Sequence, residues 1–459
     1  MKRIMLILCI CLMLSGCQEK ARKVPEEAYT VTMSLWEPGT EKELSAGVQQ
    51  VVDDYQQLHP DVQVKIQVYP VEEYNESLRE LYSMDALPEI ISNHAYDLKL
   101  LAQKGILLDI SKELSQESSY EKQTAWKDVF DKQFCGLANS LYENGCYNIP
   151  FFNNETAVFY NREVYQKLGL QVPKTWNELI SNFEIIQKNG KTAIGIMEEK
   201  EDMKLWLDWE IGNEIGLETM LANPDINLNG DDRITEYEIS CAIQSGAINY
   251  ETDSYIHEWY EEYAARLEKL FQYSTIYKGV GESAVKASFL DGDFVHLNTG
   301  SWDAVSILGD ERFGVFRFPT SASCSAVQSM AVTTSAEKAP NQKETVIDFL
   351  QFFTSREEYQ KFTDITLQLP VIKGVTMSPQ MRCFENDGMS SKTALSYVGY
   401  DCVEARLRGK QLKFEQNYFR EIEERAQKKA LDNLTKYYQE NAEDYLEAKF
   451  VRKGDPKNE

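Results

Sequence analysis

Residues 29–36 read YTVTMSLW and residues 62–69 read VQVKIQVY, and these two stretches, with the segment between them, decide the fold class. Both stretches are rich in β-branched residues that alternate with other types, which is typical of strands. The segment from about 41 to 58 has the apolar spacing of a helix. A strand, a helix and a strand joined by short connections predict a parallel sheet with a right-handed crossover.

The same α/β pattern recurs further along the chain. Three more strands are expected, at residues 87–91, 193–197 and 293–297. A helix is expected from 98 to 104, where Gly105 ends it. The stretch from about 414 to 450 sets an apolar stripe against long charged side chains, which predicts a C-terminal helix. The recurrence indicates two α/β units rather than one.

The N-terminus has the three parts of an export signal. Lys2 and Arg3 precede an apolar run, residues 4–14, that is too short to span a bilayer, which needs about 20 residues. The run ends in LSGC, residues 14–17, which resembles the bacterial lipobox that is cut before its cysteine. The resemblance implies that Cys17 becomes a lipid-modified N-terminus. The alternative is an ordinary signal peptide in which Cys17 is incidental.

On this interpretation residues 1–16 are a lipoprotein signal peptide and residues 17–27 a short polar tether. Loss of Lys2 and Arg3 takes the formal net charge from −25 to −27. A charge of this sign argues against nucleic acid and acidic lipid as ligands and favours a neutral ligand. The tether would hold the protein at the outer face of the bacterial cytoplasmic membrane, extracellular or periplasmic.

Six cysteines follow Cys17, and the sequence leaves their pairing open. The pairs closest in sequence are Cys135 with Cys146 and Cys383 with Cys402. Both are candidate disulfides in an exported protein. No CxxC motif occurs, which argues against a zinc ribbon or a thioredoxin-like redox site.

Several further segments together resemble the family 1 extracellular solute-binding proteins of ABC importers, the group that includes maltose-binding protein. The segments are LPEII at 87–91, LAQKGIL at 101–107, YNIP at 147–150, VFYNR at 158–162, LGLQVPKTWNEL at 168–179, GSW at 300–302, FTSRE at 353–357 and LP at 369–370. Each segment alone is weak evidence. Their order and spacing over most of the chain, behind a lipobox, carry the resemblance.

The resemblance implies a two-lobed, class II periplasmic-binding-protein-like α/β fold, with mixed sheets flanked by helices and the ligand between the lobes. It places three crossings of the chain near residues 149–154, 316–320 and 354. Lobe 1 then comprises residues 28–150 and 319–354, and lobe 2 residues 151–318 and 355–459. It also implies closure about a hinge and delivery of a sugar or oligosaccharide to an ABC permease by a monomer.

A sugar site needs flat aromatic side chains for the C–H face of the ring and polar groups for its hydroxyls. Such side chains should follow the carboxyl ends of strands. Trp302 follows a strand and matches a stacking tryptophan of the family, although a tryptophan packed in the core is the alternative. Trp36 and Glu37 stand where the first strand ends, with packing of Trp36 under the loop equally open.

Five more ligand contacts are expected from the polar and aromatic side chains of other loops. Asn93 and Asp97 follow the third strand, where both are also candidate helix caps. Asn154 lies at the first crossing, where many relatives place a carboxylate. Trp206 and Trp209 follow the strand at 193–197 and would supply a second aromatic face, with packing in a helical core as the alternative.

Residues 225–238, DINLNGDDRITEYE, resemble a calcium-binding EF-hand loop. The candidate ligands are Asp225, Asn227, Asn229, Asp231, Glu236 and Glu238. Neither of two registers is complete, because Asp232 falls where one needs an apolar residue and the other a glycine. The alternative is a solvated acidic turn. No cofactor is required, and calcium would be structural.

The sequence lacks a GxSxG elbow, an HExxH helix and a P-loop, which argues against the enzymes that carry them. An enzyme on the same scaffold, glycoside- or thiamine-degrading, is the first alternative. Thiaminase I, which resembles these proteins, carries a cysteine shortly after the first-crossing proline, whereas this chain has Phe151, Phe152 and Asn153 there. The second alternative is a surface or sensor lipoprotein that binds without transport.

Overall fold

The predicted strand, helix and strand are present in the computed structural model as β1 (Tyr29–Glu37), α2 (Glu43–Leu58) and β2 (Val62–Pro70), with β1 and β2 parallel. The structure describes residues 29–37, 43–94, 98, 101–102, 104–132, 134, 145–197, 214–228, 230, 234, 242, 245–248, 253–278, 280–319, 325–385, 429, 433 and 436. Within these residues, no helix combines the length and the apolar character that crossing a membrane requires.

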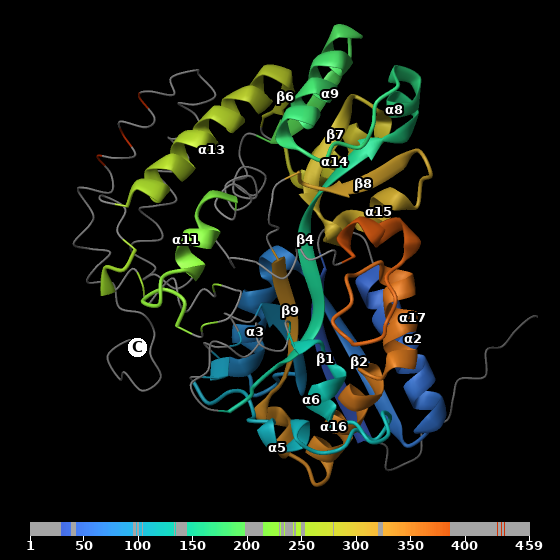
Figure 1. Cartoon of the computed structure of the whole chain (residues 1–459). Coiled ribbons are helices and arrows are strands. Elements are labelled where there is room, and N and C mark those ends of the chain that lie inside the picture. Colours follow the sequence, from blue (N-terminus) through green and yellow to red (C-terminus); the bar gives the residue numbers. More distant parts are fainter. Residues whose placement is uncertain are drawn as a thin grey trace, which may run out of the picture.

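Nine strands form one continuous mixed sheet, and the long strand β4 (Ile149–Asn161) runs through both of its halves (Figure 1). In the lower half, β1 pairs in parallel with β2 and with β3 (Ile90–His94). β9 (Ser325–Val332) lies antiparallel between β3 and the first residues of β4. We call this half, with its helices, the lower lobe.

In the upper half, the last residues of β4 pair antiparallel with β7 (Phe294–Gly300) and with β8 (Phe313–Arg317). β5 (Thr192–Met197) lies parallel to β7 and to β6 (Ser274–Tyr277). We call this half, with its helices, the upper lobe. The strands expected at 193–197 and 293–297 are therefore confirmed as β5 and β7.

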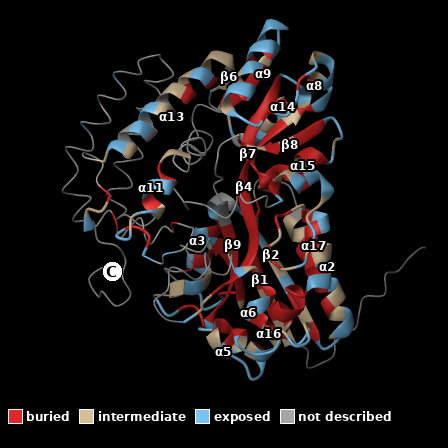
Figure 2. Ribbon diagram, in the orientation of Figure 1, coloured by how far each residue is buried: buried red, intermediate tan, exposed pale blue. Residues whose placement is uncertain are grey.

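Helices cover both faces of the sheet, and Figure 2 shows buried strands between helices whose outer sides are exposed. The remaining helices are α3 (Val71–Ser83), α5 (Ser111–Leu114), α6 (Trp126–Val129), α8 (Arg162–Leu168), α9 (Trp176–Lys188), α11 (Leu217–Leu221), α13 (Ser254–Tyr273), α14 (Glu282–Asp291), η1 (Ser301–Asp303), α15 (Ala304–Leu308), η2 (Thr334–Glu337), α16 (Gln342–Phe353), α17 (Arg356–Thr366) and η3 (Pro379–Phe384). At the C-terminus, the described residues Lys429, Asn433 and Lys436 are helical.

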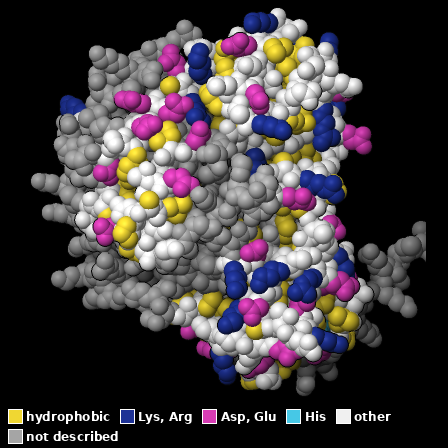
Figure 3. Space-filling view, in the orientation of Figure 1, with side chains coloured by type: hydrophobic (Ala, Val, Ile, Leu, Met, Phe, Trp, Pro, Cys, Tyr) yellow, Lys and Arg dark blue, Asp and Glu magenta, His cyan; other side chains and the backbone are white. Residues whose placement is uncertain are grey.

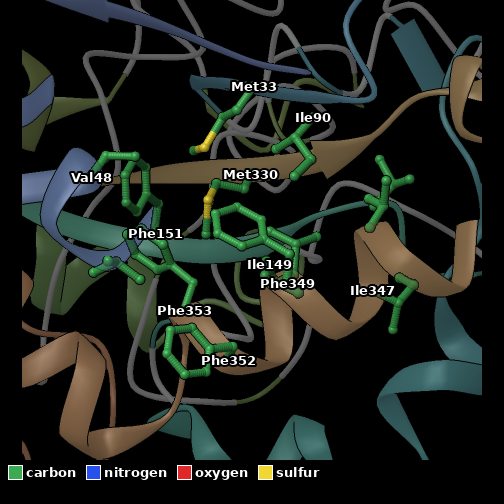
Figure 4. Packing of buried hydrophobic residues seen from close by; sticks show 14 of the residues in the cluster. Met33, Val48, Ile90, Ile149, Phe151, Met330, Ile347, Phe349, Phe352 and Phe353 are labelled. Carbon is green, nitrogen blue, oxygen red and sulfur yellow. The ribbon is translucent and has the colours of Figure 1, made fainter. Parts of the chain in front are cut away.

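The lower lobe has a core of aliphatic and aromatic side chains, with two methionines, between the sheet and α16 (Figure 4). Phe151 of β4 lies 5.6 Å from Phe353 and 5.3 Å from Phe362, measured between ring centroids. The lower end of the strand that links the lobes is therefore packed into this core. The upper lobe has two cores, one on each face of its sheet.

Helix α17 follows the predicted third crossing near residue 354 and packs on α2 of the lower lobe. Its Phe362 belongs to the lower core. Leu369 then lies in an upper core, Ile372 in the lower core and Met381 in the upper core again. The apolar stripe of α17 is buried against the lower lobe because it needs a partner face. The three predicted crossings and the lobe boundaries stay predictions.

The third strand begins later than expected. β3 starts at Ile90 rather than Leu87, because Pro88 has no N–H for the ladder and is confined to the edge of the strand. The polar residues Ser92 and Asn93 continue it, and both are buried. The strand therefore reaches His94, further toward the upper lobe than the apolar run alone indicated.

Candidate functional site

The carboxyl ends of the lower parallel strands point toward the upper lobe. β1 ends at Glu37 and β3 at His94. Gln328 of β9 pairs with His94 on one side and with Phe152 of β4 on the other. Since β3 and β4 are both antiparallel to β9, they run in the same direction. The lower strand ends therefore lie level with Phe152.

The carboxyl ends of the upper parallel strands point the opposite way. β7 ends at Gly300, which pairs with Thr156 of β4, and β5 runs beside β7 to end at Met197. Phe152 and Thr156 are four residues apart, which is about 13 Å at about 3.3 Å per residue. Strand ends from both lobes thus face each other across one short segment of β4. This is the part of an α/β protein where ligands bind.

Trp302 stands at the upper side of this junction, in η1 directly after β7. Its ring is half-buried against the core that contains Phe289 and Leu297. The six-membered part of the indole lies over Gly300, so that a methyl group built there would overlap it. The expected position directly after the strand is confirmed, and the stacking of the ring on a ligand stays a prediction.

Trp36 stands at the lower side, one residue before β1 ends, and it too is half-buried. With the Gln328 amide oriented to satisfy its neighbours, the amide oxygen accepts from Trp36 Nε1 at 3.0 Å and from the Asn93 N–H at 3.2 Å. The His94 ring lies 5.6 Å from the Trp36 ring, between centroids. Trp36 is therefore held by a strand that is almost 300 residues away in sequence.

Glu37 and Asn93 already have partners within the lower lobe. The Glu37 carboxylate, 4% exposed, accepts from the Ser45 N–H at 2.7 Å and the Ser45 hydroxyl at 3.0 Å, which caps the first turn of α2. Asn93 donates to the Asn75 amide oxygen at 2.8 Å and accepts from the His94 N–H at 2.9 Å. Both side chains stiffen the strand ends, and their roles as ligand contacts stay predictions.

Asn154 lies on the β4 segment between the two levels and is 6% exposed. Its Oδ1 has no hydrogen-bond partner among the described residues. A buried amide oxygen of this kind costs free energy unless a ligand or water donates to it. The position agrees with the predicted contact at the first crossing, although the contact itself stays a prediction.

A buried ion pair that the sequence did not predict lies at this junction. Arg317 Nη2, at the end of β8, lies 3.0 Å from Glu155 Oε2 on β4, and the two side chains are 9% and 4% exposed. Arg317 also donates to the Phe384 carbonyl at 2.9 Å. Asn153 Nδ2 donates to Glu155 Oε1 at 3.3 Å. The sequence did hint at this pair, since Glu155 directly follows the first predicted crossing and Arg317 lies in the second.

Cys383 lies beside this ion pair and is a free cysteine in the structure. Burial raises the pKa of its thiol to about 12, so the sulfur stays protonated and unreactive near neutral pH. Cys402 lies outside the described residues, and its pairing with Cys383 stays a prediction. Cys135 lies outside the described residues, and its pairing with Cys146 stays a prediction.

Other predicted residues fall outside the described part of the chain. These are Cys17, Asp97, Trp206, Trp209, Asn229, Asp231, Glu236 and Glu238. Of the calcium loop, Asp225 is exposed, whereas Asn227 is buried and accepts from the Gly230 N–H at 2.9 Å. No group of three or more metal-ligating side chains occurs among the described residues. Calcium binding stays a prediction.

Comparisons with known proteins agree with this geometry. A multiple sugar-binding protein of Streptococcus mutans serotype c is 20% identical over 191 residues, so the matched segment spans 40% of this chain and 40% of that curated relative. The apo form of RafE from Streptococcus pneumoniae is 18% identical, with a TM-score of 0.64 over 91% of this chain and 99% of RafE.

Maltose-bound MalE3 of T. maritima is 15% identical, with a TM-score of 0.62 over 90% of this chain and 99% of MalE3. At such identities the likeness shows the fold, which is the two-lobed one that the sequence predicted. Residues 50–387, well over half of the chain, match the family described as bacterial extracellular solute-binding protein. The chain therefore belongs to the family of bacterial extracellular solute-binding proteins.

Proposed function

We propose that this protein captures a sugar or small oligosaccharide between its lobes and hands it to the permease of an ABC importer without altering its bonds. The observation that carries the proposal is the placement of Trp36 and Trp302 at facing strand ends, on either side of one segment of β4. Two flat apolar rings suit the C–H faces of a sugar, and Asn154 between them suits a hydroxyl.

The names of related proteins support sugar as the ligand class. The Streptococcus mutans relative is called a multiple sugar-binding protein. RafE has been solved in complex with raffinose, and MalE3 with maltose. A sugar is therefore the ligand class that we test first.

The charges near the junction favour a neutral ligand. Glu155 is paired with Arg317, Asp303 lies 3.1 Å from Lys286, and Glu37 caps α2. On the face shown in Figure 3, acidic and basic side chains are interspersed over both lobes. The formal net charge of −25 repels anionic solutes, and the pairing of the charges near the junction leaves little local attraction for a cation.

Transport follows from closure of the lobes about the sugar. Ligand that touches both Trp36 and Trp302 binds the closed form better than the open form and so shifts the population toward closure. A permease that recognises the closed monomer would then receive loaded protein only. In this proposal, lipid on Cys17 anchors the protein to the outer face of the cytoplasmic membrane, and no enzymatic step occurs.

Calorimetry tests the binding function directly. The chain without residues 1–16, with Cys17→Ser to keep it in solution, is titrated with raffinose, maltose, xylo-oligosaccharides and chito-oligosaccharides. We expect one-to-one binding of at least one of these sugars and its recovery unchanged by chromatography. Glucuronate is the charged control and should give no heat. Appearance of cleavage products would assign the protein to the enzymes instead.

Uptake measurements test the transport function. Cells that produce the protein should accumulate the radiolabelled sugar, and cells that lack its gene should not. Restoring Cys17→Ser protein should leave uptake poor, because the binding protein is then no longer held near the permease. Equal uptake with and without the gene would leave binding without transport as the function.

A further inference from the structure

The turn that carries Trp302 has an unusual arrangement of one glycine and three buried polar residues. Gly300 has φ −141° and ψ 175°, an extended backbone that any residue adopts. Glycine is required there for space, because the six-membered ring of Trp302 lies where a side chain would begin. We call the position of the ring over Gly300 the Trp302 seat.

Side-chain hydrogen bonds hold the residues on both sides of Trp302. The Ser301 hydroxyl, fully buried, accepts from the Glu155 N–H at 3.2 Å and so ties the turn to β4. Asp303, 4% exposed, accepts from the Thr299 hydroxyl at 2.6 Å and from Lys286 Nζ at 3.1 Å. The residues before and after Trp302 are therefore buried and held, whereas Trp302 itself stays partly exposed.

This arrangement fixes a large side chain before any ligand arrives. A tryptophan that rotates freely loses rotamer freedom when a ligand immobilises it, and this loss weakens binding. A ring already resting on a glycine, in a turn fastened at both ends, has lost that freedom on folding. The part of the ring that stays accessible therefore keeps one orientation.

We propose that Gly300 and Asp303 are positioning residues, which hold the Trp302 indole in its seat as a preformed platform for the apolar face of a neutral sugar ring. This inference rests on the proposed function and deepens it. Gly300 acts by leaving room for the ring, and Asp303 acts by holding the turn through Thr299 and Lys286. Neither residue needs to touch the sugar.

The first experiment needs no ligand and measures the near-ultraviolet circular dichroism of Trp302. The signal of this ring is the difference between the spectra of the protein and of Trp302→Phe. Gly300→Ala should remove most of that difference, because the added methyl group expels the ring. Gly309→Ala is the matched control, since its backbone is helical and a methyl group there meets only the Val305 carbonyl at 3.4 Å.

The second experiment measures the Kd of the panel sugar that binds most tightly. Gly300→Ala should raise Kd about tenfold and Gly309→Ala should not. In the Trp302→Ala background, Gly300→Ala should leave Kd unchanged, because it acts only through the missing ring. Thr299→Val, which removes only the hydroxyl bond to Asp303, should raise Kd about threefold.

The outcomes separate this inference from the proposed function. Equal effects of Gly300→Ala with and without Trp302, or an unchanged Trp302 signal in Gly300→Ala, would overturn the seat while sugar binding stands. If no panel sugar binds, sugar binding fails, and the dichroism of Gly300→Ala still decides whether the ring is seated. Thermal unfolding of each variant checks that it is folded.

Discussion

The two tryptophans at the junction are held in different ways. Trp36 of the lower lobe is held by a hydrogen bond from its indole N–H to Gln328. Trp302 of the upper lobe is held by shape, with its ring resting on Gly300. The first restraint depends on a residue from a distant strand, and the second depends on a glycine two residues before the ring. The seat of Trp302 can therefore be recognised from local sequence, whereas the restraint on Trp36 is seen only in the folded sheet.

Both tryptophans lie beside one segment of β4, the segment that carries Glu155, and we call this segment the frame. Glu155 receives a bond from Arg317, and its backbone N–H donates to Ser301 beside Trp302. The lower end of the same strand is packed into the aromatic core. Each of the following experiments perturbs the frame, one lobe or one of the two tryptophans.

The largest expected effect is on the frame. Arg317→Met leaves the Glu155 carboxylate buried without its cation and should lower the free energy of unfolding by about 3–5 kcal/mol. Urea denaturation at pH 7 measures it. The control is Arg312→Met, five residues before Arg317. It breaks an exposed pair with Asp310 and should change stability little. Equal losses in the two variants would mean that the buried pair does not hold the frame.

The next effect is a pH dependence of stability that arises in the upper lobe. Burial lowers the pKa of His296 in the upper lobe to about 4, and its Nε2 accepts from the Tyr165 hydroxyl at 2.7 Å while Nδ1 donates to the Ala193 carbonyl at 2.8 Å. Its unfolded value is 6.5, so the unfolded chain binds more protons between pH 6.5 and 4. Stability is therefore complete above pH 6.5 and falls as the pH drops, by about 2 kcal/mol at pH 5.

Urea denaturation at pH 7 and pH 5 tests this effect, with His296→Gln as the comparison. The variant keeps a neutral hydrogen-bonding side chain and should lose about 2 kcal/mol less on acidification. His94 of the lower lobe is exposed, and His94→Gln should leave the pH dependence as it is. An identical pH dependence in the protein and in His296→Gln would contradict the assignment.

The third effect is on the affinity for sugar and compares Trp302 with Trp36. Trp302→Ala should weaken sugar binding at least tenfold, which is about 1.4 kcal/mol, and Trp36→Ala by a similar factor. The double variant should weaken binding about a hundredfold if the rings contact different parts of the sugar. Calorimetry gives the three values. Unchanged affinity in either single variant removes that tryptophan from the site.

The smallest effect concerns how Trp36 is held. Gln328→Leu removes the acceptor of the indole N–H and should raise Kd about fivefold, or about 1 kcal/mol. In a Trp36→Phe background, which has no N–H to satisfy, the same substitution should have little effect on Kd. A comparable loss in both backgrounds would show that Gln328 acts on the strand ends generally and not through Trp36.

Much of the fold followed from local pattern. β1, α2, β2, β5 and β7 were predicted from alternation and helical spacing, because each buries one face and its apolar residues recur at the matching period. The start of β3 was missed because Pro88 lies inside the apolar run. The packing of α17 on α2 was not predicted, because the apolar face of a helix does not say which distant element it will cover.

The site was predicted only where its residues follow strands directly. Trp36 and Trp302 were placed at strand ends, which the structure confirms. The capping of α2 by Glu37 and the pairing of Glu155 with Arg317 were not predicted. A carboxylate has the same local sequence whether it meets a ligand, a helix end or a cation.

The sequence by itself determined the α/β class, the family and the Gly-Ser-Trp turn, because strand periodicity and a glycine beside a large ring are properties of neighbouring residues. Only the tertiary structure decided that strand ends from both lobes meet at one level of β4, that Gln328 reaches Trp36 and that Arg317 pairs with Glu155. These contacts join residues far apart in the chain. Their formation depends on sheet register, which no local stretch specifies.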